Sequence, residues 1–96
     1  MLYLKVDGEM SGTGIRNSVD GEFLTAKELG LSLALQKQID DWVKCYTDCH
    51  YENYSDKGKV TELDREGLEI CGKIQESKPD IKVGYYSSAY LKDIVL

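Results

Sequence analysis

The clearest hydrophobic pattern lies in the middle of the chain. Five apolar side chains recur there at spacings of four, three, one and three residues: Leu35, Ile39, Trp42, Val43 and Tyr46. This spacing places them on one face of an amphipathic helix, while charged residues fall on the other faces. Ser32 precedes the pattern and is a favoured N-cap residue. The pattern predicts a helix over about 33–51.

A second amphipathic pattern follows after a polar, tyrosine-bearing segment at 51–59. The residues on its apolar stripe are Leu63, Gly67, Ile70, Cys71 and Ile74. They predict a helix from about Thr61 to Ser77, which Pro79 ends. A glycine inside a helix costs about 1 kcal/mol relative to alanine. Because Gly67 lies on the apolar stripe, we expect another backbone to approach it closely.

Shorter segments flank the two helices. Residues 2–6 and 81–86 are rich in strand-forming side chains and predict strands, and 15–19 is a candidate third strand. Residues 91–96 fit either a last short strand or a terminal helical turn. Thr25 and Glu28 have capping-box spacing, so one or two helical turns are expected over 24–29, with Gly30 as the stop.

This order of elements predicts one domain over residues 1–96. A strand that follows two helices favours a sheet with its helices on one face. The expected fold class is α/β in the broad sense, more closely α+β, with a small sheet of two to four short strands and two main amphipathic helices packed on it.

Composition limits the function classes. The 96 residues carry a net charge of −5, with 42% hydrophobic and 30% charged residues, which is typical of a globular domain. The acidic residues are spread along the chain, so direct binding to nucleic acid is disfavoured. An acidic surface would steer the protein towards a basic protein partner, although the same charge also serves solubility.

The chain also predicts a compartment. Its first residues lack the basic and apolar regions of a signal peptide, and its apolar runs are far shorter than the roughly 20 residues of a membrane span. Three cysteines without a signal peptide suggest reduced thiols. We therefore expect a cytoplasmic protein without membrane contact.

No candidate chemistry is compelling. The glycine-rich segment 8–14 lacks the motif positions of a phosphate-binding loop and indicates a turn. Cys45 and Cys49 share a helix face, but His50 projects about 100° away, which is unfavourable for zinc. The paired carboxylates read mainly as solvated helix faces. We therefore predict no catalytic residue, no cofactor and no metal ligand.

Tyrosine is the most suggestive residue type. Two tyrosines lie in the segment between the helices and three cluster near the C-terminus, with acidic residues between them. Tyrosine is enriched at protein interfaces because it buries a large area while keeping a polar end. Burial or partial burial in the core is the competing interpretation, especially for Tyr3 and for one of Tyr85 and Tyr86.

The overall patterning resembles a family of small bacterial proteins, the immunity proteins encoded beside polymorphic or contact-dependent growth-inhibition toxins. The resemblance covers most of the chain and is carried by 29–32, 63–67, 82–87 and by Ile39, Trp42, Tyr46 and His50. It implies a protein that binds and neutralises a basic toxin domain, with a nuclease as the expected class, in the cytoplasm of the producing cell.

The resemblance transfers no binding residue, so the predicted interface rests on composition. It comprises Asp48, Tyr51, Glu52, Tyr54, Tyr85, Tyr86 and Asp93. Two alternatives stay open. One is a small enzyme that uses a pocket carboxylate or the pair Cys45 and His50. The other is a homo-oligomeric regulatory subunit that uses the same tyrosines on itself.

Overall fold

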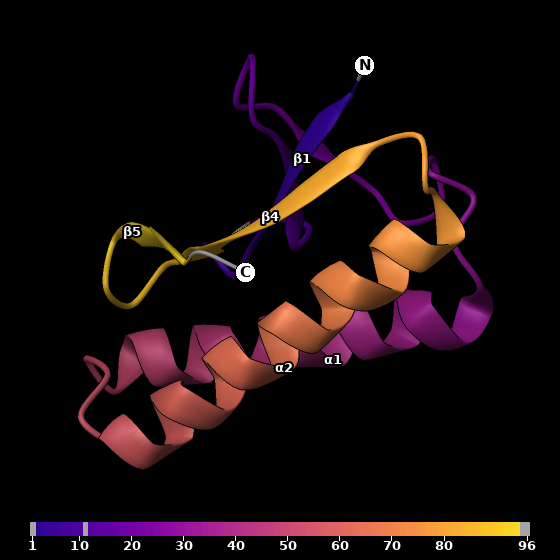
Figure 1. Ribbon diagram of the computed structural model, residues 1–96. Coiled ribbons are helices and arrows are strands. Elements are labelled where there is room, and N and C mark those ends of the chain that lie inside the picture. Colours follow the sequence, from indigo (N-terminus) through magenta and orange to yellow (C-terminus); the bar gives the residue numbers. More distant parts are fainter. Residues whose placement is uncertain (1, 11, 95–96) are drawn as a thin grey trace.

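A five-stranded mixed sheet and two helices make up the fold (Figure 1). The computed structural model describes residues 2–10 and 12–94. In chain order the elements are β1 (Tyr3–Asp7), β2 (Ile15–Asn17), β3 (Phe23–Leu24), α1 (Leu33–Tyr51), α2 (Lys57–Ser77), β4 (Lys82–Ser87) and β5 (Lys92–Ile94). The strand order is β3-β2-β1-β4-β5, and β1 and β4 form its one parallel pair.

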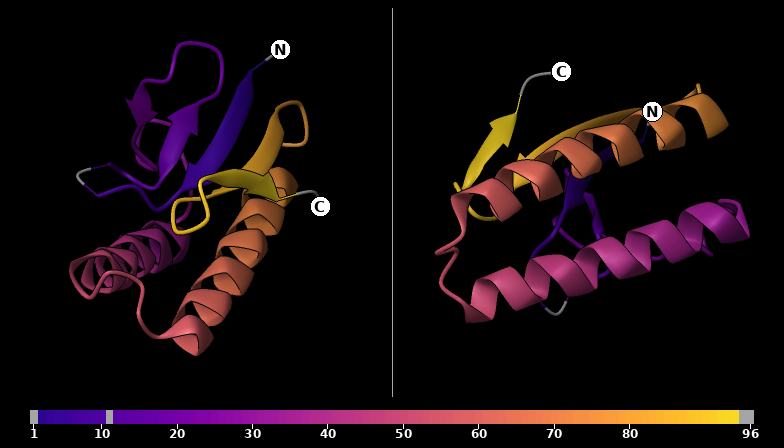
Figure 2. Two further views of the ribbon diagram at one scale, coloured as in Figure 1. Left: turned by 90° about the vertical axis from the view of Figure 1, so that its left-hand side faces the viewer. Right: turned by 90° about the horizontal axis from the view of Figure 1, so that it is seen from below.

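Both helices lie on the same face of the sheet (Figure 2). They form the crossover between β1 and β4, and a parallel pair needs such a long connection. The α+β class with two packed helices is therefore confirmed. The predicted number of strands, two to four, is too low, because the two-residue strand β3 was not expected. Strands that short carry no alternating pattern to detect.

Side chains along β1 and β4 point alternately to the two faces of the sheet. One face is covered by the helices and the other is open. Leu4 and Val6 of β1 and Val83 and Tyr85 of β4 are buried beneath the helices. From α1, Trp42 reaches across the core, and its indole N–H donates to the Leu63 carbonyl oxygen over 2.8 Å. The intervening strand residues face the other side, away from both α1 and α2 (Figure 2).

The two helices begin at capping side chains. Helix α1 has the predicted bounds, and Ser32 Oγ accepts the Leu35 N–H over 3.2 Å. Helix α2 starts four residues before the predicted Thr61, because Asp56 caps it by accepting the Lys59 N–H. Because Gly58 lies between two lysines, the sequence of this first turn is typical of a loop, although Val60 within it is buried.

The other predictions from local sequence hold in part. The expected strand at 15–19 is shorter, at 15–17. Thr25 and Glu28 form the reciprocal bonds of a capping box, but only turns follow them before Gly30, whose φ is +70°. Of the two options for 91–96, the strand is observed over 92–94, and 95–96 lie outside the described residues.

Gly67 lies against a side chain, not against the expected backbone. A Cβ atom at this position would be 2.1 Å from Cε1 of the Tyr85 ring, far inside van der Waals contact. The missing side chain therefore lets the Tyr85 ring approach α2 closely, which brings its hydroxyl to Asp64 on the same helix.

Candidate functional site

Three connections meet at one end of the molecule, where β1 and β4 end and α1 passes to α2 (Figure 2). We call this the loop end and define it as residues 8–10, 48–56 and 88–91. A cavity of about 410 Å³ joins the three segments and is lined by Glu9, Met10, His50, Tyr54, Ser88, Ala89 and Leu91. Residues that are far apart in sequence thus form one continuous surface.

Unusual backbone geometry is concentrated at the loop end. Among residues 2–10 and 12–94, the three non-glycine residues with positive φ are Asn53 (57°), Tyr54 (54°) and Leu91 (54°), and all three lie here. A bulky residue in this region is strained and must be held by its surroundings. The Tyr54 N–H donates to the Cys49 carbonyl oxygen over 2.8 Å, and its ring packs edge-on against Tyr46. Such strain is often found where a protein presents side chains to a ligand.

The loop end also exposes large side chains. Tyr51 is 73% exposed and Leu91 is 74% exposed, while Met10 and Tyr90 are more than one-third exposed. Glu9, Asp48 and Glu52 are exposed beside them. Aromatic and apolar side chains surrounded by acidic ones form the usual anatomy of a protein interface with a charged rim.

A second, smaller cavity adjoins the first at the carboxyl ends of β1 and β4. It measures about 250 Å³ and is lined by Asp7, Glu9, Arg16, Tyr86, Ser88 and Leu91. Three of these residues, Glu9, Ser88 and Leu91, line both cavities. We call it the Asp7 pocket. Its position at the ends of parallel strands is where α/β sheets commonly bind ligands.

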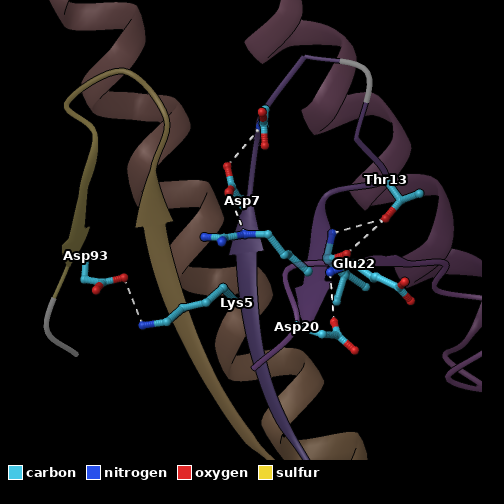
Figure 3. A network of polar contacts seen from close by, with 9 residues as sticks. Lys5, Asp7, Thr13, Asp20, Glu22 and Asp93 are labelled. Atoms are coloured by element: carbon cyan, nitrogen blue, oxygen red, sulfur yellow. Dashed lines mark hydrogen bonds and ion pairs between the residues drawn. The ribbon is translucent and has the colours of Figure 1, made fainter. Parts of the chain in front are cut away.

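The Asp7 side chain is only 2% exposed, and each of its carboxylate oxygens makes one polar contact (Figure 3). Its Oδ1 accepts the Glu9 N–H over 3.1 Å. Arg16 Nε lies 3.1 Å from Oδ2, but its N–H is not aligned on an acceptor within the described residues, so we treat this contact as an ion pair. Burial raises the pKa of Asp7 above its usual range, and the opposing charge of Arg16 does not reverse this effect.

The Arg16 side chain links Asp7 to the neighbouring strand. Its guanidinium carbon lies 5.3 Å from the centroid of the Tyr86 ring, which is a cation–π geometry. Asp7, Arg16 and Tyr86 are held on the open face of the sheet by the registers of β2, β1 and β4. The pocket wall is therefore built on regular strands and has a fixed shape.

A second carboxylate, Asp64 on α2, accepts three hydrogen bonds. Its Oδ1 accepts the hydroxyls of Tyr46 and Tyr85, and its Oδ2 accepts the Ser87 hydroxyl over 2.9 Å. Burial raises the pKa of both tyrosines, so both remain protonated donors. This network ties α1, α2 and β4 together, and we interpret it as structural.

The predicted interface residues divide into three groups. Asp48, Tyr51, Glu52 and Tyr54 lie together at the loop end, and Tyr86 lines the adjoining Asp7 pocket. Asp93 lies on the edge strand β5, where its carboxylate is 2.9 Å from Lys5 Nζ (Figure 3). The inclusion of Tyr85 needs correction. Its side chain is completely buried in the core, so it cannot contact a partner in this fold.

Nothing in the geometry activates a thiol. Cys49 and Cys71 are buried, and burial raises the pKa of Cys71 to about 12. Cys45 is exposed, and the His50 Nδ1 atom contacts the Tyr54 hydroxyl at 3.2 Å. Within 2–10 and 12–94, no three His, Cys, Asp or Glu side chains are arranged to hold a metal ion. In the same residues, neither helix is long and apolar enough to cross a membrane.

Sequence reasoning missed the charged residues of the Asp7 pocket. The glycine-rich segment 8–14 was predicted to be a turn, and neither Asp7 nor Glu9 was among the predicted site residues. The available signal was the position of Asp7 directly after the strand residues of β1, because a polar residue there points to the carboxyl edge of the sheet. Arg16 could not be paired with it without the antiparallel register of β1 and β2.

Comparison with known proteins gives no match to a protein-family model, to a curated protein or to a solved structure.

Proposed function

We propose that this protein is an immunity-type inhibitor, which binds the toxin domain encoded beside it and neutralises it without any catalytic step of its own. The loop end is the binding surface. The toxin is a basic protein domain, with a nuclease as the expected class, and the interaction takes place in the cytoplasm of the producing cell.

The observation that carries this proposal is the composition and build of the loop end. Exposed Tyr51 and Leu91 supply large apolar areas, and the backbone around Tyr54 and Leu91 is held in a strained conformation. A prearranged aromatic surface loses little conformational freedom on binding, so more of its contact energy appears as affinity.

The distribution of charge supports a basic partner. Residues 33–77, which contain both helices, carry ten acidic and six basic side chains, so this part contributes −4 of the net −5. The connection between the helices lies at the loop end, where Glu52 and Asp48 are exposed. Complementary charge accelerates association and makes it sensitive to salt.

The test is co-purification with the product of the adjacent gene. We expect a 1:1 complex whose association slows as salt is raised, together with loss of the toxin's activity. If the neighbouring product is neither bound nor inhibited, the proposal is wrong. A complex of this chain with itself alone, seen as a concentration-dependent mass, would favour the homo-oligomeric alternative.

Two variants of matched exposure locate the surface. Tyr51→Ala removes a 73%-exposed ring at the loop end, and Leu33→Ala removes an 81%-exposed side chain at the other end of α1. We expect the first to weaken toxin binding about tenfold or more and the second to leave it unchanged. Equal effects of both variants would show that the loop end is not the interface.

A further inference from the structure

The Asp7 pocket has unused capacity to accept hydrogen bonds. An ionised carboxylate offers about four lone-pair positions. Within the described residues, Asp7 accepts one aligned hydrogen bond, from the Glu9 N–H, and holds Arg16 in an off-axis ion pair. The Asp7 side chain is 98% buried. A buried charge with few hydrogen bonds is costly, so buried carboxylates usually accept more hydrogen bonds than this one does.

The charge of the pocket favours a cation. Its wall contains two carboxylates, Asp7 and Glu9, and one guanidinium, Arg16, which gives a formal charge of −1. The whole chain, at −5, adds to the same potential. Burial raises the pKa of Asp7 although the charge of Arg16 lowers it, and a second cation at this carboxylate would favour the charged form further.

The size of the pocket restricts the occupant further. Its volume of about 250 Å³ is below the roughly 300–1,000 Å³ typical of pockets for drug-sized ligands. One extended side chain fits such a space. Leu91 and the Tyr86 ring offer apolar surface for a methylene stem, and Ser88 adds a hydroxyl at the wall.

We propose that the Asp7 pocket receives one lysine or arginine side chain of the protein partner, with its cationic group against Asp7 and Glu9 and its stem against Leu91. This inference rests on the proposed function, since it takes the partner to be a basic toxin domain. The adjoining larger cavity, lined by Met10, Tyr54 and Ala89, then accepts the apolar residues that flank the basic one.

The first experiment needs no partner. The ¹⁵N-labelled full chain is titrated with methylguanidinium chloride, with sodium chloride as the salt control and sodium N-acetylglutamate as the anionic probe. We expect saturable shifts of the backbone amides of Glu9, Arg16, Tyr86 and Ser88 with the cation only. Shifts with the anion alone would overturn the proposal and assign the pocket to Arg16 as an anion receptor. No shift with either probe would also overturn it.

The second experiment separates this inference from the proposed function. Asp80 is exposed in the turn before β4, at the end of the sheet opposite the pocket, so Asp80→Asn removes the same charge as a matched control. For the toxin complex we expect Asp7→Asn to weaken Kd about 30-fold or more, Glu9→Gln a few-fold, and Asp80→Asn not at all.

The outcomes are distinguishable. If the wild-type chain binds and inhibits the toxin while Glu9→Gln and Asp7→Asn bind like the wild type, the pocket proposal is wrong and the proposed function stands. If the wild-type chain does not bind the toxin, the proposed function is wrong, and the titration with methylguanidinium still decides whether the pocket accepts a cation. Because Asp7 is buried and Glu9 is exposed, Glu9→Gln tests the pocket in a variant whose folding is not at issue.

Discussion

Two carboxylates, Asp64 and Asp7, lie on opposite faces of the same sheet and have different surroundings. Asp64 is on the helix side, where three hydroxyl groups donate to it: those of Tyr46, Tyr85 and Ser87. Asp7 is on the open side, where it has one aligned donor and an off-axis guanidinium. Both carboxylates line a cavity, so the difference between them lies in their donors.

The difference shows how to separate structural from functional polar groups. A carboxylate that accepts three hydrogen bonds from the protein has little capacity left for a ligand, and its network fixes the positions of the elements that it joins. An under-compensated carboxylate beside a cavity lowers the stability of the free protein and gains from a bound cation. On this basis Asp64 fixes α2 against β4, and Asp7 is available for binding.

The largest effect on stability is expected from Asp64→Ala. It leaves the buried hydroxyls of Tyr46 and Tyr85 and that of Ser87 without their shared acceptor, at about 1–3 kcal/mol for each unsatisfied group. We expect the free energy of unfolding to fall by about 3 kcal/mol or more in urea titrations. A loss below about 1 kcal/mol would show that water replaces the carboxylate, and the structural interpretation of Asp64 would be wrong.

A smaller loss is expected from Gly67→Ala, with Gly72→Ala as its control on the same helix. A Cβ at Gly67 meets the Tyr85 ring at 2.1 Å, so the ring must shift away from Asp64, whereas Gly72 has nothing within 4 Å. We expect Gly67→Ala to cost about 1–3 kcal/mol through overpacking. Gly72→Ala should add up to about 1 kcal/mol through helix propensity. Stabilisation by both variants would show that the ring moves freely.

The effect of Asp7→Asn on stability should be small and dependent on pH. The pKa of Asp7 in the folded protein is raised above its ordinary 3.8, so the folded state holds this proton more tightly than the unfolded chain. The stabilisation from protonated Asp7 is full below pH 3.8 and is lost as pH rises through the raised folded pKa. Relative to the asparagine variant, the wild type should therefore gain stability on acidification through this window.

Urea titrations of both proteins across the acidic range measure this difference. The opposite trend, in which the wild type loses stability relative to Asp7→Asn as pH falls, would show that Arg16 fully compensates the carboxylate. In that case Asp7, like Asp64, would be a structural carboxylate.

The smallest effect on stability is expected at Tyr51. Its ring is 73% exposed, so Tyr51→Ala should change the free energy of unfolding by no more than about 0.5 kcal/mol while it weakens toxin binding. Thermal unfolding of the variant checks the first part. A clear loss of stability would assign Tyr51 to packing against His50, whose ring centroid lies 6.0 Å away.

Elements with a long repeating pattern could be predicted from the sequence, and elements joined by long-range contacts could not. The period of the apolar residues placed α1 at its observed bounds, because a helix of 19 residues repeats its pattern five times. Strand β3 has two residues and exists because Ile15 and Arg16 pair with it. Local propensity holds no information about that pairing.

In the candidate site, too, local clusters could be predicted from the sequence and long-range contacts could not. The cluster Asp48, Tyr51, Glu52 and Tyr54 was visible because its members are neighbours in sequence. The Asp7 pocket combines residues from the start and the end of the chain, which only the parallel pairing of β1 and β4 brings together. The exclusion of Tyr85 likewise depended on the alternation of β4, which turns Tyr85 towards the helices and Tyr86 away from them.

Hydrogen–deuterium exchange of the full chain, alone and saturated with the toxin domain, shows directly whether the loop end is the binding surface. We expect added protection on residues 8–10, 48–56 and 88–91, while exchange around Asp64 and in the turns at Gly30 and Lys78 is unchanged. Protection confined to those turns, or to the exposed faces of α1 and α2 away from the loop end, would contradict the assignment of the loop end as the binding surface.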